Sequence, residues 1–211
     1  MSEFLRRLGK AKRKGTPTDL LVVGLGNPGE QFAGTRHNVG AGVVELLAER
    51  HGVRLRKTKA RALAAGVVLD GRRVVIAFPQ TFMNNSGEAV RTLARSYGVL
   101  EPKHIVVVHD ELDLEPGRLR LKSGGGMAGH NGLRSITQHL GTTEYLRLRI
   151  GVGRPPGSQT GADYVLRPPG KADREVLQIA VAEAADAIEK LNAEGLDATM
   201  SVVNRRRPEK D

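Results

Sequence analysis

Asparagine and histidine side chains gather in the loops that follow predicted strands, and these residue types could do chemistry together. Five of the seven asparagines lie in such loops or at their junctions with helices, namely Asn27, Asn38, Asn84, Asn85 and Asn131. A neutral amide offers donors and an acceptor, which suits holding an amide or ester carbonyl and a water molecule. We expect Asn38 and Asn85 to have structural roles, because asparagine is also common in turns and at helix caps.

Three histidines, His37, His109 and His130, lie in the same group of loops. Histidine takes up a proton near neutral pH, and Asp110, directly after a predicted buried strand, could orient a ring and stabilise its charged form. The run HDELD, from His109 to Asp113, could alternatively bind a metal ion, although its spacing matches no recognised ligand pattern. A histidine–aspartate pair is therefore the favoured proton-transfer group.

Familiar catalytic and nucleotide motifs are incomplete in this sequence. Gly24–Gly29 fits G-x-G-x-x-G, but Pro28 and a long loop separate it from the next helix, and no acidic residue ends the next strand. The segment Lys122–Gly132 lacks the final G-K-[S/T] of a phosphate loop, and no serine lies in G-x-S-x-G or S-x-x-K. With no cysteine and no H-E-x-x-H either, an activated water is the expected nucleophile.

The charge balance predicts a polyanionic partner. The chain has 211 residues, with 33 Lys and Arg against 23 Asp and Glu, a formal net charge of +10. Six basic residues fall within positions 1–18, so we expect a basic flexible arm at 1–18, a domain at 19–204 and a basic C-terminal tail at 205–211. The absence of cysteine fits the cytoplasm, and no apolar run long enough to span a membrane or act as an export signal is present.

Basic side chains near the same loops could bind phosphate groups. They are Lys122, Arg134, Arg147 and Arg149, with a second cluster between Arg54 and Arg61. Arg147 and Arg149 occupy alternate positions of a predicted strand and so share a face. Only 3% of residues are aromatic, so we expect contacts to a nucleic-acid backbone rather than stacking on bases.

Alternating strands and helices predict a single α/β domain with a twisted, mostly parallel mixed sheet and helices on both faces. Expected strands are 20–23, 61–69, 73–78, 105–108, 118–121 and 146–152. Expected helices are 38–52, 87–97, a short one from 131, and 173–192, with a loop or covering flap over 153–169. The functional loops should meet at the carboxyl ends of the strands, at 24–37, 79–86, 109–117 and 123–131.

Four segments in order resemble bacterial peptidyl-tRNA hydrolases. They are VVGLGNPGEQFAGTRHNVG (22–40), PQTFMNNSGEAV (79–90), HDELDLEPGRLRLKSGGGMAGHNGLRSI (109–136) and YLRLRIGVGRP (145–155). The similarity extends over about 20–204. It implies a metal-free, cofactor-free cytoplasmic enzyme that is monomeric, needs no protein partner or membrane, and hydrolyses the ester between a peptide and the 3′ end of tRNA.

The resemblance also implies residue roles. By matching motif positions, His37 is the general base and Asp110 orients it. Asn27 distinguishes blocked from free aminoacyl esters, while Asn84 and Asn131 bind the peptidyl end and place the water.

Further substrate contacts follow from the same resemblance. Phe82 and Met83 are expected to line the peptide channel, and Lys122 and Arg149 to clamp the terminal phosphate of tRNA. Phe32 is assigned to substrate binding but stands where many members have tyrosine. Met127 and Ala128 replace a commoner His-Gly, which would change the mobility of the glycine loop.

Two other functions compete with the esterase. One is a non-catalytic RNA-binding or splicing paralogue of the same fold, which would not need His37, Asp110 and the three asparagines together. The other is a nucleotide-dependent oxidoreductase using Gly24–Gly29, which the distant helix and missing acidic residue disfavour.

Overall fold

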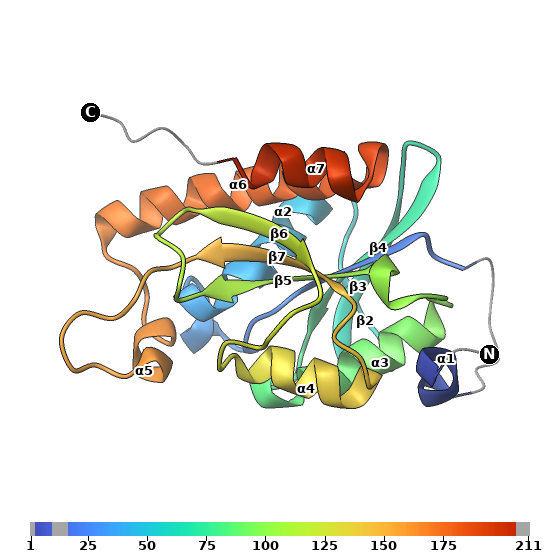
Figure 1. Cartoon of the computed structure of the whole chain (residues 1–211), viewed down its shortest axis with the longest axis horizontal. Coiled ribbons are helices and arrows are strands. Elements are labelled where there is room, and N and C mark those ends of the chain that lie inside the picture. Colours follow the sequence, from blue (N-terminus) through green and yellow to red (C-terminus); the bar gives the residue numbers. More distant parts are fainter. Residues whose placement is uncertain (1–2, 10–16, 206–211) are drawn as a thin grey trace.

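The computed structural model describes residues 3–9 and 17–205. A seven-stranded sheet in the order β2-β3-β4-β1-β5-β7-β6 forms the centre of the molecule (Figure 1). The strands are β1 (Leu20–Gly24), β2 (Arg56–Lys57), β3 (Ala62–Leu69), β4 (Arg72–Pro79), β5 (Ile105–Glu111), β6 (Leu119–Ser123) and β7 (Leu146–Gly151). The four central strands are parallel, while β2, β3 and β6 pair antiparallel to their neighbours. The predicted mixed, mostly parallel α/β sheet is thus confirmed.

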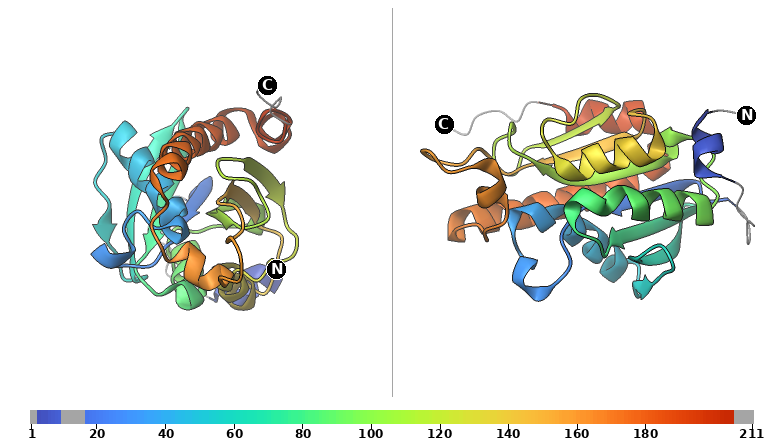
Figure 2. Two further views of the ribbon diagram at one scale, coloured as in Figure 1. Left: turned by 90° about the vertical axis from the view of Figure 1, so that its left-hand side faces the viewer. Right: turned by 90° about the horizontal axis from the view of Figure 1, so that it is seen from below.

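Two layers of helices cover the sheet (Figure 2). The helices are α1 (Glu3–Leu8), α2 (Val39–Arg50), α3 (Ser86–Ser96), α4 (Asn131–Leu140), α5 (Gly161–Val165), α6 (Lys171–Glu194) and α7 (Leu196–Val203), with 3-10 turns η1 (Glu30–Phe32), η2 (Arg36–Asn38), η3 (Met83–Asn85) and η4 (Pro102–His104). Alternate residues of the central strands point into two aliphatic cores, one beneath α2 and α6 and the other beneath α3 and α4. Because both faces are covered, the central strands are almost continuously apolar.

Gly24, the first glycine of GLGNPG, and Gly40 in α2 allow this helix to approach the sheet closely. A Cβ at Gly24 would overlap the carbonyl oxygen of Gly40 in α2, and one at Gly40 would overlap that of Val108 in β5. The backbone N–H of Leu25 donates to Val108 O at 2.9 Å, which ties the end of β1 to β5. These glycines therefore serve packing, and they place the following loop at the carboxyl edge of the sheet.

The N-terminal segment differs from the predicted arm. Residues 3–8 form α1, and Phe4 and Leu8 are buried in the core beneath α3 and α4. These two residues are one helical turn apart, so they form a small apolar stripe among the basic side chains. The expectation of a flexible arm is wrong for this stretch, whereas residues 10–16 and the tail residues 206–211 lie outside the described residues.

Other differences are local. The predicted flap over 153–169 contains α5, and α7 and the two-residue strand β2 were not expected. Asn38 does precede α2, but its side chain makes no capping hydrogen bond. None of the helices in the described part of the chain is long and apolar enough to cross a membrane.

Candidate active site

The predicted functional loops meet at the carboxyl edge of the sheet, around a cleft of about 770 Å³. It lies where the loops after β1, β4 and β5 face the start of α4, beside the change of direction in strand order between β1 and β5. Eight of the ten predicted site residues line it: Asn27, Phe32, His37, Phe82, Met83, Asn84, Asp110 and Asn131. The other two, Lys122 and Arg149, line a neighbouring hollow.

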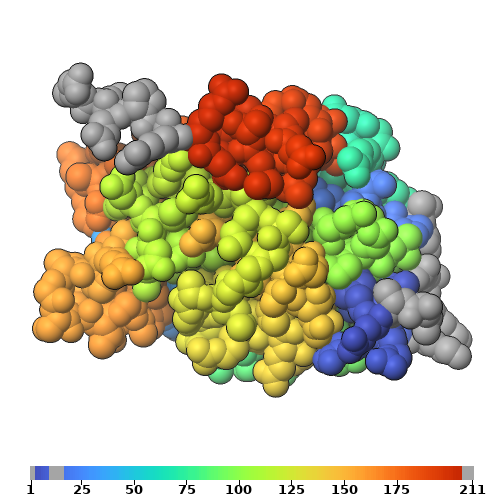
Figure 3. All heavy atoms as spheres, in the orientation of Figure 1, coloured from blue at the N-terminus to red at the C-terminus, as the bar shows by residue number. Residues whose placement is uncertain are grey.

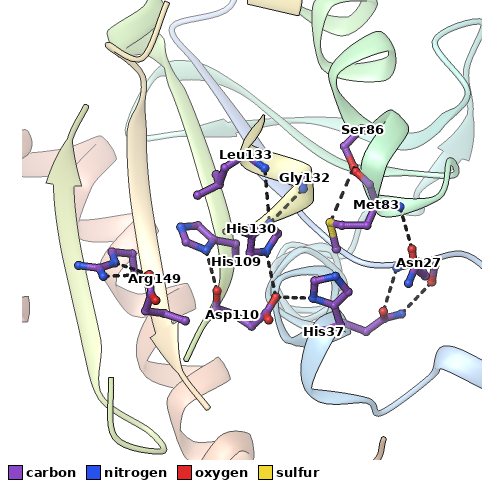
Figure 4. Close-up of polar contacts among 12 residues, drawn as sticks. Asn27, His37, Met83, Ser86, His109, Asp110, His130, Gly132, Leu133 and Arg149 are labelled. Carbon is purple, nitrogen blue, oxygen red and sulfur yellow. Dashed lines mark hydrogen bonds and ion pairs between the residues drawn. The ribbon is translucent and has the colours of Figure 1, made fainter. Parts of the chain in front are cut away.

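His37 and Asp110 form a buried hydrogen-bonded pair (Figure 4). His37 comes from η2 and Asp110 from β5, and Nδ1 of the ring lies 2.8 Å from Asp110 Oδ1. A carboxylate can only accept this hydrogen bond, so Nδ1 carries the proton and Nε2 has the free lone pair. The ring is therefore oriented to accept a proton at Nε2.

His130 joins His37 and Asp110 in a three-residue network. His130 was not among the site residues predicted from the sequence. Its Nε2 lies 3.1 Å from the same Asp110 oxygen, while its Nδ1 accepts hydrogen bonds from the backbone N–H groups of Gly132 and Leu133 at 3.1 and 3.4 Å. These contacts fix one tautomer, with the proton on Nε2. The clue in the sequence was its place directly before Asn131, where it caps α4.

The network also decides the charge of Asp110. Burial opposes ionisation of the carboxyl, but the electrostatic attraction and the hydrogen bonds of the His130 and His37 rings outweigh burial and hold its pKa well below the usual range. Asp110 therefore stays a carboxylate that accepts from both rings. A metal ion could also be coordinated here, because the ligand atoms of His37, Asp110 and His130 lie within 4.8 Å of one another.

Asn27 is held so that only its amide nitrogen remains to be used. Its Oδ1 accepts from the Met83 backbone N–H at 2.8 Å. The Asn38 side chain binds both its backbone N–H and its backbone carbonyl, each at 2.9 Å. Asn38 thus has the expected structural role, but it holds the Asn27 backbone in place instead of capping α2. The Asn27 Nδ2 group remains as a donor for a ligand in the cleft.

The remaining cleft residues supply polar and apolar walls. Asn84 and Asn131 are exposed on elements that face each other across the cleft, η3 and the start of α4. Phe82 is 59% exposed, an unusual surface for a phenyl ring, whereas Met83 is buried beneath it. The cleft therefore combines amide donors with an apolar surface.

Lys122 and Arg149 line the second cavity, about 300 Å³ in volume, which we call the basic hollow. Arg147 is also in its wall, opposite Lys122 in the β6–β7 register. Arg149 binds Glu111 Oε2 through Nε at 2.9 Å and Nη2 at 2.8 Å, a pairing not anticipated from the sequence. Burial, followed by the charges of Arg149 and Arg147, lowers the pKa of Lys122.

The cleft and the basic hollow share Glu111 and Ala128, and His109, which lines the hollow, packs against His130, which lines the cleft. The His109 Nδ1 donates to the Asp110 backbone oxygen at 2.8 Å, and its ring contacts that of His130 edge-on at 5.0 Å. Burial and the neighbouring His130 lower the pKa of His109 to about 3. The His109 ring is therefore neutral near pH 7, and it separates the basic hollow from His130 in the cleft.

Ala128 has a positive φ of 46°, and its neighbours Gly124, Gly125 and Gly129 also have positive φ. This conformation suits glycine and costs other residues of order 1 kcal/mol. Ala128, which stands where glycine is commoner in the family, therefore occupies a backbone position that favours glycine.

Comparisons with known proteins identify the family of this chain. The sequence model of the peptidyl-tRNA hydrolase family matches residues 21–211. A peptidyl-tRNA hydrolase from Frankia alni is 51% identical over 188 residues, which cover 88% of this chain and 95% of the relative. One from Nocardia farcinica is 53% identical over 184 residues, covering 86% and 94%.

A crystal structure of peptidyl-tRNA hydrolase from Acinetobacter baumannii is similar with a TM-score of 0.85 and 36% identity, covering 92% of this chain and all of that one. These proteins are hydrolases with an α/β fold, and this chain has the same fold, with a histidine–aspartate pair in its cleft. The chain belongs to the peptidyl-tRNA hydrolase family.

Proposed function

We propose that this enzyme hydrolyses the ester that joins a peptide, or an N-blocked aminoacyl group, to the 3′ end of tRNA. The observation that carries this proposal is the 2.8 Å His37–Asp110 pair in a cleft lined by three asparagines. An ester is already activated, so a positioned water and a base suffice for its hydrolysis. The proposed role is to return tRNA to translation, in the cytoplasm, with the enzyme acting as a monomer.

His37 is the proposed general base. Its Nε2 takes a proton from water as the oxygen attacks the ester carbonyl, and Asp110 stabilises the ring while it is charged. His130 keeps the Asp110 carboxylate in place through the second hydrogen bond, at 3.1 Å. The proton then passes from His37 to the departing 3′ oxygen of tRNA, and the acid product leaves as the free peptide.

Amide donors are proposed to stabilise the charge on the carbonyl oxygen during this attack. Asn27 Nδ2, Asn84 and Asn131 are neutral, so they stabilise the oxyanion without adding a fixed charge to the cleft. Removing one such donor typically costs about 10²-fold or more in kcat.

Asn27 and Asn84 are the proposed basis of discrimination against free aminoacyl-tRNA. The first peptide amide of a blocked substrate can hydrogen-bond to them, whereas a free aminoacyl ester presents an ammonium group. An ammonium group cannot accept the hydrogen bond that Asn27 Nδ2 offers, which leaves a polar group unpaired. The side chain of the amino acid need not be read, so many peptides would be accepted.

The basic hollow is the proposed contact for a tRNA phosphate. Lys122 and Arg149 supply the charge, and the hollow adjoins the cleft at Glu111 and Ala128. The test is release of tRNA from N-acetyl-aminoacyl-tRNA and from unblocked aminoacyl-tRNA, by the wild-type enzyme and by His37→Ala. We expect the wild-type enzyme to release tRNA from the blocked substrate only. The rate of this release should be about 10²–10⁴-fold lower in His37→Ala.

Two outcomes would overturn the proposal. Equal rates on blocked and unblocked substrates would remove the assigned role of the asparagines. Unchanged release by folded His37→Ala would remove the assigned base. A chelator is included as a control, and activity is expected to survive it because the proposed mechanism uses only water and protein groups.

A further inference from the structure

Arg36, the residue before His37, is a buried arginine whose described contacts all lie far away in the sequence. Its side chain is 7% exposed, and it belongs to the 3-10 turn η2 that carries His37. A buried guanidinium is costly unless its donors are satisfied, and the fold supplies partners for Nη1 and Nη2, whereas Nε has none in the described structure. These partners come from residues 164–173, about 130 positions further along the chain.

Four contacts connect Arg36 to this segment. Nη1 donates to the carbonyl oxygens of Arg167 at 3.3 Å and Pro168 at 3.2 Å. Nη2 binds Asp173 Oδ2 at 3.0 Å, and the guanidinium carbon lies 4.0 Å above the centre of the Tyr164 ring. A planar fork of donors can make all of these contacts together, whereas the ammonium group of lysine cannot.

The segment so held forms one wall of the cleft. Gly161, Ala162, Val165 and Leu166 line the cleft, facing the loops that carry Phe32 and Phe82. The surrounding segment, drawn in orange, projects at one end of the molecule in Figure 3. Besides Arg36, the Tyr164 hydroxyl donates to Val152 O at 3.0 Å, Tyr164 and Val165 are buried in the core beneath α2 and α6, and Arg154 pairs with Asp113.

We propose that Arg36 is a positioning residue that holds the α5 wall against the loop carrying His37 and so sets the width of the cleft around the acyl part of the substrate. This proposal rests on the proposed peptidyl-tRNA substrate. Asp110 in β5 orients the His37 ring directly, and Arg36 is not among the residues that line the basic hollow, so we expect both to keep their geometry without the Arg36 contacts. Loss of Arg36 should therefore weaken binding of the acyl group more than it slows the chemical step.

The first test is steady-state kinetics of Arg36→Ala and Arg36→Lys on N-acetyl-aminoacyl-tRNA. We expect KM to rise on the order of tenfold in Arg36→Ala, with kcat within about threefold and an unchanged pH profile of kcat. The KM of Arg36→Lys should lie between those of the wild type and Arg36→Ala, because lysine keeps the positive charge but lacks the planar set of donors. An unchanged KM, or a fall in kcat with a shifted pH profile, would overturn the proposal.

Two control variants separate positioning from loss of stability. Asp173→Asn removes only the partner that is 41% exposed and should change KM less than Arg36→Ala does. Leu191→Ala opens a space in the core at the other end of α6 and should lower the melting temperature while KM stays unchanged. A raised KM in Leu191→Ala would mean that general destabilisation explains the Arg36 result, against the proposal.

A spectroscopic test does not depend on the substrate. The chain has no cysteine, so Ser158→Cys gives a unique position for a nitroxide label on the segment before α5. We expect the label to become more mobile when Arg36→Ala is added and to change little when Asp173→Asn is added. Unchanged mobility would show that Arg36 does not hold the wall. If the wild-type enzyme releases no tRNA, the proposed function fails, while the label still decides the role of Arg36.

Discussion

The cleft and the basic hollow are neighbours that work by different physical principles. In the cleft, neutral amides and a histidine–aspartate network are fixed by short hydrogen bonds to the backbone and to one another. In the basic hollow, Lys122, Arg147 and Arg149 collect positive charge, with Glu111 as the one carboxylate among the lining residues described. We therefore expect side-chain orientation to control the chemistry in the cleft, and positive charge to control binding in the hollow.

Arg147 illustrates the contrast. It is buried, its Nη1 donates to the carbonyl oxygen of Gly126, and its Nε and Nη2 have no hydrogen-bond partner in the described structure. Unsatisfied donors of this kind are costly in a folded protein, but they suit a site that receives an anion. No cleft residue leaves comparable buried donors unpaired among the described side chains. These unpaired donors support the proposal that the hollow receives a charged ligand and the cleft a neutral one.

The largest effect should come from the cleft, through Asp110→Asn. The variant keeps an oxygen for the two histidines but loses the charge that stabilises His37 when it is protonated. We expect kcat on blocked aminoacyl-tRNA to fall about 10²–10⁴-fold with KM nearly unchanged. Asp113→Asn, in an exposed pair with Arg154, is the matched control and should retain activity. A KM defect in Asp110→Asn would contradict the division of labour between the two cavities.

Next in size is Asn27→Asp, which changes one donor into an acceptor. The variant still accepts from Met83 N–H, but it no longer donates to a peptide amide, and its negative charge attracts a free ammonium group. The ratio of blocked to unblocked rates should fall by about 10²-fold. Asn85→Asp, an exposed change two residues beyond Met83, serves as the control. A preserved ratio would show that another residue discriminates.

A smaller effect is expected in the basic hollow from Lys122→Ala. We predict a rise in KM of about tenfold at low salt, and a reduction by roughly 0.7–0.9 in the slope of log affinity against log salt concentration. Lys103→Ala makes the same charge change before β5, at the opposite edge of the sheet, and should leave both quantities unchanged. If kcat falls instead of affinity, the hollow takes part in the chemistry.

The smallest effect concerns His109, between the two cavities. Its pKa is lowered to about 3 in the folded protein, so between pH 6.5 and 3 the unfolded chain binds a proton that the folded one does not. Stability should therefore fall as pH falls through this window, by about 1 kcal/mol at pH 5.5 from this residue, or roughly 2–4 °C. Melting temperatures at pH 7.5 and 5.5 should differ less in His109→Gln than in the wild type. An equal difference would contradict the burial of a neutral ring.

Patterns in the sequence predicted six of the seven strands described, the convergence of the loops at their carboxyl ends, and the residue types that line the cleft there. Buried aliphatic runs such as Ile105–Val108 have few alternatives to a central strand, and parallel strands bring their following loops to one edge. His37, Asp110 and Asn27 were found because their residue types suit proton transfer and amide binding, and because four motifs resemble a known family. Phe4 and Leu8 were missed because a short apolar stripe carries little signal beside six basic residues.

The hydrogen-bond partners of these groups, in contrast, depend on how distant segments fold together. Asn38 precedes a helix and has the sequence of a cap, yet a longer-range contact turns its side chain to Asn27. The pairing of Arg149 with Glu111, and of Arg36 with the segment around Tyr164, joins residues that no local pattern relates. Hydrogen-bond partners depend on distances of a few ångströms between distant segments, whereas strands and helices follow from patterns within a few residues.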